Sequence, residues 1–345
     1  MATLNYSNRL QNIQNRKYDP ELRVSLMSES ASAKSLPEDV RYLIESMRTI
    51  DDSYNKKTIN AAERVQTHLE TNFNLHFNRA YRTQGSVITN TNIKIHSDFD
   101  LLAIIDKYFY PEKSPSNVYT ESDPNDDIRE MRKQSIRILK EIYDEVDDTG
   151  EKNISIYNKS LKRKVDIVFC YWYHSTKYEE TKGDGSYEYY RGIYLYKFPT
   201  GPKEKDFPFA HIHNVNYKGD ITNDGSRKGI RLLKTLKADC ESSIDNLKGF
   251  HLTSIVHSIE NDQLFYRSGD EINIAKAISG HINLIINNPE YRKSILSPNG
   301  TEYPFLNDKI VTDLIILRQD LDTLIEDSIK DITNSQSVRS AILTY

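Results

Sequence analysis

The sequence has little cysteine, with only Cys170 and Cys240 among 345 residues. The two lie far apart, so they cannot form a zinc site by themselves, and a disulfide framework is not expected. No stretch approaches 18 consecutive apolar residues, which argues against a transmembrane helix. The first ten residues lack a hydrophobic signal region. We therefore expect a cytoplasmic protein that does not enter a membrane.

An excess of positive charge is also missing. The chain carries 46 Lys and Arg against 50 Asp and Glu, for a net charge of −4. A strongly basic footprint for nucleic acid is therefore absent from the chain as a whole. Hydrophobic residues make up 37% and charged residues 28%, which is typical of a globular protein. The length suits one large bilobal unit or two domains.

The predicted elements differ between the two halves of the chain. The first half mixes helices and strands, with helical spacing over 36–73 and 128–146 and strand patterns over 80–86, 99–105, 154–157, 164–173 and 189–198. The second half is helical over 229–247, 250–260, 272–288 and 311–332, after an irregular stretch at 199–228. This order predicts an α+β core with a mixed sheet and a C-terminal α-helical lobe. We place an N-terminal extension at 1–35, a catalytic core with an N-terminal spine helix at 36–215, and the lobe at 216–345.

Two acidic residues stand at the start of an apolar strand pattern. Asp98 and Asp100 point to the same side of a strand, because side chains alternate along it. The run 101–105 is apolar enough for a buried central strand. Two carboxylates at its exposed start repel each other, and a divalent cation with a preference for oxygen ligands would offset that repulsion. Two solvated acids at a strand end would give the same local pattern.

Two further sequence features indicate a function only when they are combined with this pair of acids. Gly85 lets the backbone approach a phosphate closely, and Ser86 adds a hydroxyl donor, although Gly-Ser also marks ordinary turns. Asp166 interrupts an apolar strand pattern. An acid within a strand is unfavourable unless it has a functional role, although a surface-facing position would also tolerate it. Together, a strand ending in Gly-Ser, an Asp-apolar-Asp strand and a distant apolar-Asp-apolar strand form the signature of the polymerase-β-like nucleotidyltransferases.

The resemblance extends to one family within that superfamily. The carrying residues are Gln84–Ser86, Ser97–Leu102 and Lys164–Val168, with a weaker match at Arg227–Lys234. In these stretches the chain resembles the cGAS/DncV-like nucleotidyltransferases (CD-NTases), bacterial relatives of animal cyclic GMP-AMP synthase. The resemblance implies a polymerase-β-like core and a helical lobe with the active site in the cleft. It also implies synthesis of a cyclic oligonucleotide, with a dinucleotide favoured, as a second messenger in anti-phage defence.

The resemblance also assigns tasks to particular residues. Asp98, Asp100 and Asp166 are expected to be catalytic and to hold two Mg²⁺ ions, or Mn²⁺ in their place. The residues expected to bind the nucleotide are Gln84, Gly85, Ser86, Arg231, Lys234 and Phe250. A solvated basic helix face would explain Arg231 and Lys234 equally well, and a core aromatic would explain Phe250. The frequent Ser-Tyr-like pair of the family reads Gly249-Phe250 here, which leaves phosphate contact at that position open.

Substrates and partners follow from the same resemblance. Nucleoside triphosphates are the expected substrates, a downstream effector is reached through the released product, and we expect a monomer. The His/Cys cluster that forms the zinc-bearing DNA-binding thumb of the animal synthase is missing from the sequence. Two alternatives remain open. One is a linear-oligonucleotide, protein or RNA nucleotidyltransferase on the same core, and the other is a catalytically inactive nucleotide-binding scaffold.

Overall fold

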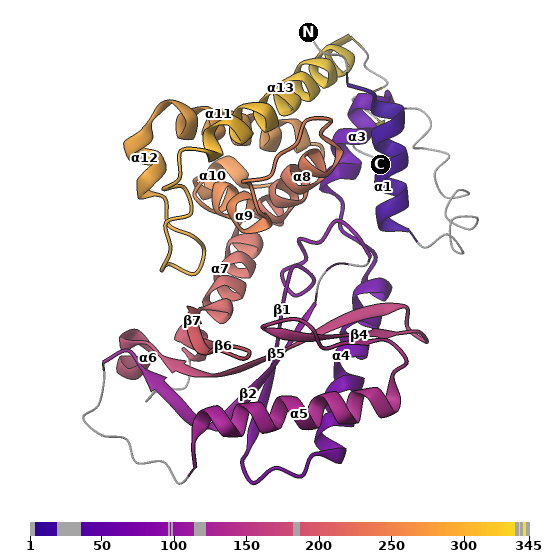
Figure 1. Ribbon diagram of the computed structural model, residues 1–345. Coiled ribbons are helices and arrows are strands. Elements are labelled where there is room, and N and C mark those ends of the chain that lie inside the picture. Colours follow the sequence, from indigo (N-terminus) through magenta and orange to yellow (C-terminus); the bar gives the residue numbers. More distant parts are fainter. Residues whose placement is uncertain are drawn as a thin grey trace. The chain divides into compact units, whose positions relative to one another are not determined.

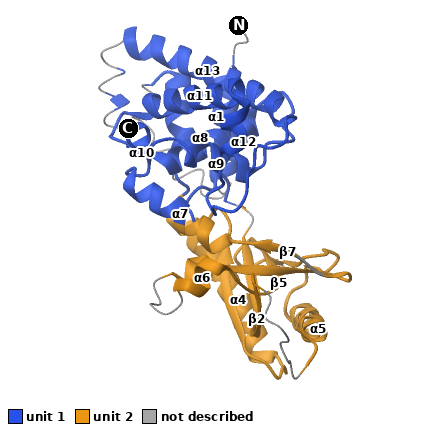
Figure 2. Cartoon of the chain, turned by 90° about the vertical axis from the view of Figure 1, so that its left-hand side faces the viewer, with its two compact units in different colours: residues 1–50, 89–95, 214–345 blue, residues 51–88, 96–213 orange. Residues whose placement is uncertain are grey.

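The computed structural model of the chain divides into two compact units. It describes residues 4–18, 36–95, 97, 99–113, 122–181, 187–334, 338 and 341–342, without the side chains of residues 202 and 203. Unit 1 comprises residues 1–50, 89–95 and 214–345, and unit 2 comprises residues 51–88 and 96–213 (Figure 2). Each unit therefore draws on separate stretches of the chain, and each is described by itself below.

Unit 2 is built on one mixed sheet. Among the described residues its strands are β1 (Arg79–Gln84), β2 (Asp100–Pro111), β3 (Val146–Asp147), β4 (Asn153–Asn158), β5 (Arg163–His174), β6 (Arg191–Lys197) and β7 (Gly201–Asp206). The order is β1-β2-β5-β4-β3, with β6 pairing β5 and β7 pairing β6. The β2–β5 pair is parallel and the others are antiparallel. The predicted α+β class with a mixed sheet is confirmed.

Apolar layers cover both faces of the two central strands, β2 and β5. On one face, Leu101 and Ile167 join a buried cluster with residues of α4 (Asp52–Asn72) and α5 (Pro124–Ile142). On the other face, Leu102 and Val168 belong to a smaller buried cluster. Figure 1 shows α5 lying along the sheet, while α6 (Thr176–Thr181) and the short 3₁₀ turn η3 (Glu188–Tyr190) precede β6. Burial on both faces explains why β2 and β5 read as continuous apolar runs in the sequence.

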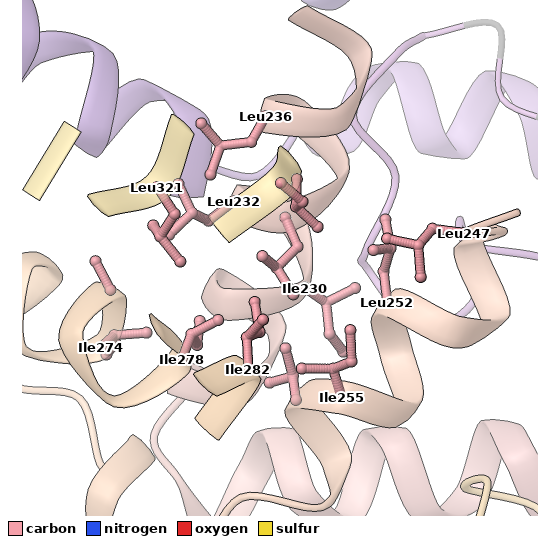
Figure 3. Close-up of a cluster of buried hydrophobic side chains, with 14 of the residues drawn as sticks. Ile230, Leu232, Leu236, Leu247, Leu252, Ile255, Ile274, Ile278, Ile282 and Leu321 are labelled. Carbon is pink, nitrogen blue, oxygen red and sulfur yellow. The ribbon is translucent and has the colours of Figure 1, made fainter. Parts of the chain in front are cut away.

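Unit 1 is helical. Its helices are α1 (Tyr6–Lys17), α3 (Glu38–Met47), α8 (Gly225–Asp239), α9 (Gly249–His257), α10 (Asn261–Leu264), α11 (Glu271–Asn287), α12 (Pro289–Ser294) and α13 (Ile310–Asn334). Ile230, Leu232 and Leu236 of α8 are each at most 1% exposed, and residues of α9, α11 and α13 surround them (Figure 3). The helix α8 is therefore the centre of this unit. In the part of the chain that is described, no helix has both the length and the apolarity to cross a membrane.

The stretch predicted as irregular, 199–228, is instead largely regular, so that prediction is wrong. It contains β7 and α7 (Pro208–Ile221), and the border between the two units falls within α7. Pro208 stands at the first helical position, where its missing N–H breaks no hydrogen bond. The proline at this position is the sequence feature that could have predicted the start of the helix.

The division in space also differs from the predicted linear boundaries. The segment 36–73, predicted as one or two helices, forms two, α3 and α4, because Arg48 is extended and Asp51 caps α4 by accepting from the Ser53 amide at 2.8 Å. Tyr42 and Met47 of α3 are buried in the core of unit 1, whereas α4 belongs to unit 2. The extension predicted at 1–35 contains α1, which buries Leu10 in that same core.

Two glycine substitutions in unit 1 should have opposite effects on stability. Gly225 begins α8, and a Cβ there would overlap the carbonyl oxygen of Leu264. We expect Gly225→Ala to lower the free energy of unfolding by about 1–3 kcal/mol. Gly280 lies on the exposed side of α11 with no atom within 4 Å of an added Cβ, so Gly280→Ala should raise it by about 0.5–1 kcal/mol. Denaturant titration of both variants measures the two shifts, and a stable Gly225→Ala would contradict the packing described.

Candidate active site

Four polar residues form a row across four neighbouring strands of unit 2. Gln84 of β1 pairs in register with Asp100 of β2, Asp100 pairs with Asp166 of β5, and Asp166 pairs with Ser155 of β4. The Asp166 amide donates to the Phe99 carbonyl at 3.1 Å, which closes the parallel pairing beside the two acids. Directly paired residues present their side chains on the same face of a sheet. The row therefore places two carboxylates side by side between two neutral hydrogen-bonding residues.

Each carboxylate of this polar row has protein hydrogen-bond partners. Gln84 Nε2 donates to Asp100 Oδ2 at 2.8 Å. Ser155 Oγ donates to Asp166 Oδ1, and Lys164 Nζ lies 3.1 Å from the Asp166 carboxylate. The Asp166 side chain is 13% exposed, so these contacts restrict its rotation in a partly desolvated place. The donors orient the carboxylates and offset part of the repulsion between them.

The row lies where the apolar surface of one sheet face begins. Two residues further along each strand, Leu102 and Val168 occupy the same face and are buried, and Ile104 and Cys170 follow them. The alternate residues, Leu101 among them, point into the cluster under α4 and α5. The acids thus directly precede the buried apolar residues of that face. A buried apolar base of this kind lets carboxylates keep a defined separation.

The donor chemistry of the row fits a hard divalent cation. Carboxylate oxygens are the ligands that Mg²⁺ prefers, and Asp100 and Asp166 present them from adjoining strands. The third predicted ligand, Asp98, lies outside the described residues. Within those residues, no group of three or more His, Cys, Asp or Glu side chains could hold a metal. The structure therefore brings together two of the three predicted acids and leaves the position of Asp98 a prediction.

Gly85 and Ser86 form the turn that leaves β1 next to the polar row. Gly85 has a φ of +116°, a backbone conformation that residues with a Cβ rarely adopt. The Ile88 amide donates to the Gly85 carbonyl at 3.2 Å. Since Gln84 pairs with Asp100, the turn begins at the residue beside the acids. The geometry thus makes the glycine a requirement of the turn, and the predicted phosphate contact of this pair stays a prediction.

Arg231, predicted to bind the nucleotide, is an internal residue of unit 1. It is 1% exposed, and its guanidinium donates to the Met47 carbonyl at 2.6 Å, the Asn90 carbonyl at 2.6 Å and Asp224 Oδ2 at 2.5 Å. A solvated basic face on α8 is therefore wrong for this residue. Its three acceptors are all protein atoms, and direct nucleotide contact by Arg231 stays a prediction.

Lys234 lies one helical turn further along α8. Its Nζ donates to the Thr91 carbonyl at 3.0 Å and to Thr91 Oγ1 at 3.2 Å. Burial, with a smaller contribution from the charge of Arg231, lowers the pKa of Lys234 to about 8. A Cβ at Gly249 would lie 3.8 Å from Lys234 Cε, so the lysine passes beside the first turn of α9, which also carries the half-buried Phe250. Unit 1 thus gathers Thr91, Lys234 and the Gly249-Phe250 pair.

Three residues at these places were not predicted as site residues. Ser155 and Lys164 contact Asp166, and Thr91 contacts Lys234. Lys164 and Asp166 are two apart on one strand, so side-chain alternation could have paired them. Ser155 and Thr91 carried no such signal, because their partners are distant in sequence.

Comparison with known proteins gives relatives over most of the chain. No family model matches the sequence. A c-di-GMP synthase from a Lachnospiraceae bacterium is 33% identical over 290 residues, covering 75% of this chain and 80% of the relative. A c-di-GMP synthase from Capnocytophaga granulosa is 30% identical over 337 residues, covering 90% and 93%. The solved STING-associated CdnE c-di-GMP synthase from Flavobacteriaceae sp. has a TM-score of 0.81 and 26% identity, covering 94% of this chain and 99% of its own.

Removing one acid from the row should weaken binding of a divalent cation. We expect Asp166→Asn to raise the dissociation constant for Mn²⁺ by at least about tenfold, because an amide is a poorer ligand for a hard cation. Asp144→Asn is the matched control, since Asp144 also contacts a lysine, Lys159, but lies outside the strands that carry the row. Isothermal titration calorimetry measures both, and a circular-dichroism melt checks folding. Equal losses in the two variants would contradict a metal site at the row.

Proposed function

The chain belongs to the cGAS/DncV-like nucleotidyltransferases (CD-NTases), and on that premise we propose that it joins two molecules of GTP into c-di-GMP. Relatives at 30% and 33% identity, over most of the length of both chains, are c-di-GMP synthases. As a member of this family the chain is a nucleotidyltransferase, and its class of product is a cyclic oligonucleotide. The guanine preference is the part of the proposal that rests on the relatives alone.

One structural observation carries the catalytic part of this proposal. Asp100 and Asp166 lie in register on adjoining parallel strands, each with a neutral residue beside it. The in-register neighbour of each acid on the parallel strand is the other acid, while Lys164 contacts Asp166 from the same strand. Like charges at neighbouring positions destabilise a sheet. The pairing of the two acids therefore supports a site at which a bound cation would offset the repulsion between them.

The proposed reaction is an in-line displacement at phosphorus, carried out twice. A ribose hydroxyl oxygen of one GTP attacks the α-phosphorus of the other, an O–P bond forms, and the bond to the β-phosphate oxygen breaks. The hydroxyl proton passes to solvent, and pyrophosphate leaves with the electron pair. A second displacement in the linear intermediate closes the ring. Divalent cations held by the acids, Mg²⁺ or Mn²⁺, would supply Lewis-acid activation of the hydroxyl and would offset the charge on pyrophosphate.

The residues of the polar row would have two tasks in this scheme. Asp100 and Asp166, with Asp98, would hold the cations through carboxylate oxygens. Gln84 contacts Asp100, while Ser155 and Lys164 contact Asp166, and these contacts would orient each acid before the substrate arrives. Preorganisation of this kind is the main contribution of protein groups to phosphoryl transfer.

The remaining predicted residues would bind the nucleotide. Backbone N–H groups and the Ser86 hydroxyl of the Gly85-Ser86 turn would contact the triphosphate. Lys234 would contribute a positive charge to the same group, and Phe250 would stack on a guanine base.

The biological setting is proposed from the relatives. A relative of known structure is a STING-associated synthase, which supports a released cyclic dinucleotide that reaches an effector protein. We propose that this chain serves the same kind of signalling in anti-phage defence, acting as a cytoplasmic monomer. The nucleoside triphosphates that it consumes are abundant in the cytoplasm.

Product analysis tests the proposed activity. Incubation with GTP and Mg²⁺ should give a phosphatase-resistant product with the mass of c-di-GMP, and Asp100→Ala with Asp166→Ala should lower turnover by at least about 10³-fold. Chromatography with mass spectrometry detects the product, and an unchanged melting profile shows that the variant is folded. A phosphatase-sensitive product would indicate linear chains, and no turnover by the wild type with any of the four triphosphates would indicate a scaffold.

The pKa of Lys234 makes nucleotide binding dependent on pH. The ammonium is charged below about pH 8 and neutral above it, and a bound triphosphate would raise its pKa. The dissociation constant for a non-hydrolysable GTP analogue should therefore rise above pH 8, by up to about tenfold per pH unit. Lys234→Arg keeps its charge over this range, so its dissociation constant should stay flat. Identical profiles for the two proteins would show that Lys234 does not contact the triphosphate.

A further inference from the structure

Residues 89–95 connect the turn after β1 to the segment that carries Asp98. In sequence they follow Gly85 and Ser86 and precede the first predicted metal ligand. They nevertheless pack in unit 1, although β1 and β2 belong to unit 2. The connection is polar yet buried, with Thr89 4%, Thr91 2% and Ile95 6% exposed. A buried polar loop needs hydrogen-bond partners, and the chain supplies several of them.

Two cations of α8 hold the first half of this connection. Arg231 donates to the Asn90 carbonyl at 2.6 Å and Lys234 to the Thr91 carbonyl at 3.0 Å. Asn90 adopts a φ of +52°, and its side-chain oxygen accepts from Thr49 Oγ1 at 2.5 Å. The left-handed conformation of Asn90 turns the chain where the arginine contacts it. The second half is held at Ile95, whose amide donates to the Arg16 carbonyl at 2.9 Å.

Arg231 differs from the other contacts because it joins three separate segments. Its Nε contacts the carbonyl of Met47 at the end of α3, one Nη contacts the connection at Asn90, and the other contacts Asp224 before α8. A planar guanidinium presents its donors in a fixed fork, so the three acceptors must keep one mutual arrangement. A lysine at this position has one nitrogen and could not reach all three.

We propose that Arg231 is a positioning residue for the reaction, because it fixes the connection 89–95 and with it the chain on either side. Gly85 and Ser86 lie only a few residues before this connection in the sequence, so we expect a looser connection to loosen the proposed phosphate turn as well. This inference rests on the proposed function and replaces direct nucleotide contact by Arg231 with an indirect role. Small displacements of catalytic groups are costly, since about 1 Å can lower the rate about 10²-fold.

The chain offers a matched control for this residue. Arg292 of α12 is also a buried arginine of unit 1, 4% exposed, and it also donates to a main-chain carbonyl and to an aspartate. Its partners are Ile285 and Asp308, which are not part of the connection. Arg292→Lys should therefore reproduce the loss of stability caused by Arg231→Lys without the loss of function.

The test compares Arg231→Lys with Arg292→Lys by kinetics and by hydrogen exchange. We expect Arg231→Lys to lower kcat for GTP about 10–100-fold and to speed amide exchange over 86–97, including the Ile95 amide. Arg292→Lys should change neither. If Arg231→Lys does not fold, Asp224→Asn serves instead, because Asn tolerates the φ of +68° at that position while losing the ionic contact to Arg231.

Two results would overturn the inference. One is a loss of kcat no larger than that of Arg292→Lys, and the other is a loss of kcat with unchanged exchange over 86–97. If the wild-type protein makes no product, that result contradicts the proposed function and not this inference. In that case the exchange comparison alone decides whether Arg231 holds the connection.

Discussion

The parallel pairing of β2 with β5 is the constraint on which the candidate site depends. It places Asp100 directly beside Asp166, and this arrangement opposes the folding of the sheet through like-charge repulsion. The apolar residues that follow on both faces of these strands stabilise the pairing more than the acids disfavour it, since each buried aliphatic side chain contributes about 1.5–3 kcal/mol. The core thus enforces a juxtaposition that a bound divalent cation would make more favourable.

Unit 1 meets the opposite electrostatic problem, because it buries cations. Arg231 and Lys234 leave water for contacts with carbonyl oxygens and, for the arginine, with Asp224. Burying a charge without such partners is strongly unfavourable, so these residues require the connection 89–95 as much as the connection requires them. The incomplete compensation at Lys234 is visible in its pKa, which burial lowers to about 8.

Most elements could be predicted from the sequence, and the failures have identifiable causes. The strands that contain Asp100 and Asp166 follow from the apolar runs after these acids, and α11 and α13 from helical periodicity. The helix α7 was missed because His, Asn and Lys interrupt its apolar pattern, so that only Pro208 marked its start. The segment 36–73 was predicted as one or two helices, and the break between α3 and α4 stayed open because helical spacing is present on both sides of it. The assignment of α1 and α3 to the helical unit depends on contacts with residues hundreds of positions away.

The sequence by itself determined which groups are available and on which strand face each acid lies, because alternation along a strand is a local property. It thereby supported the resemblance to the CD-NTases, which the relatives bear out. Only the tertiary structure decided that Gln84 and Ser155 flank the acids, and that Arg231 is buried among three carbonyl and carboxylate acceptors. Strand register and burial arise from contacts between distant segments, and the spacing of residues along one segment carries no information about them.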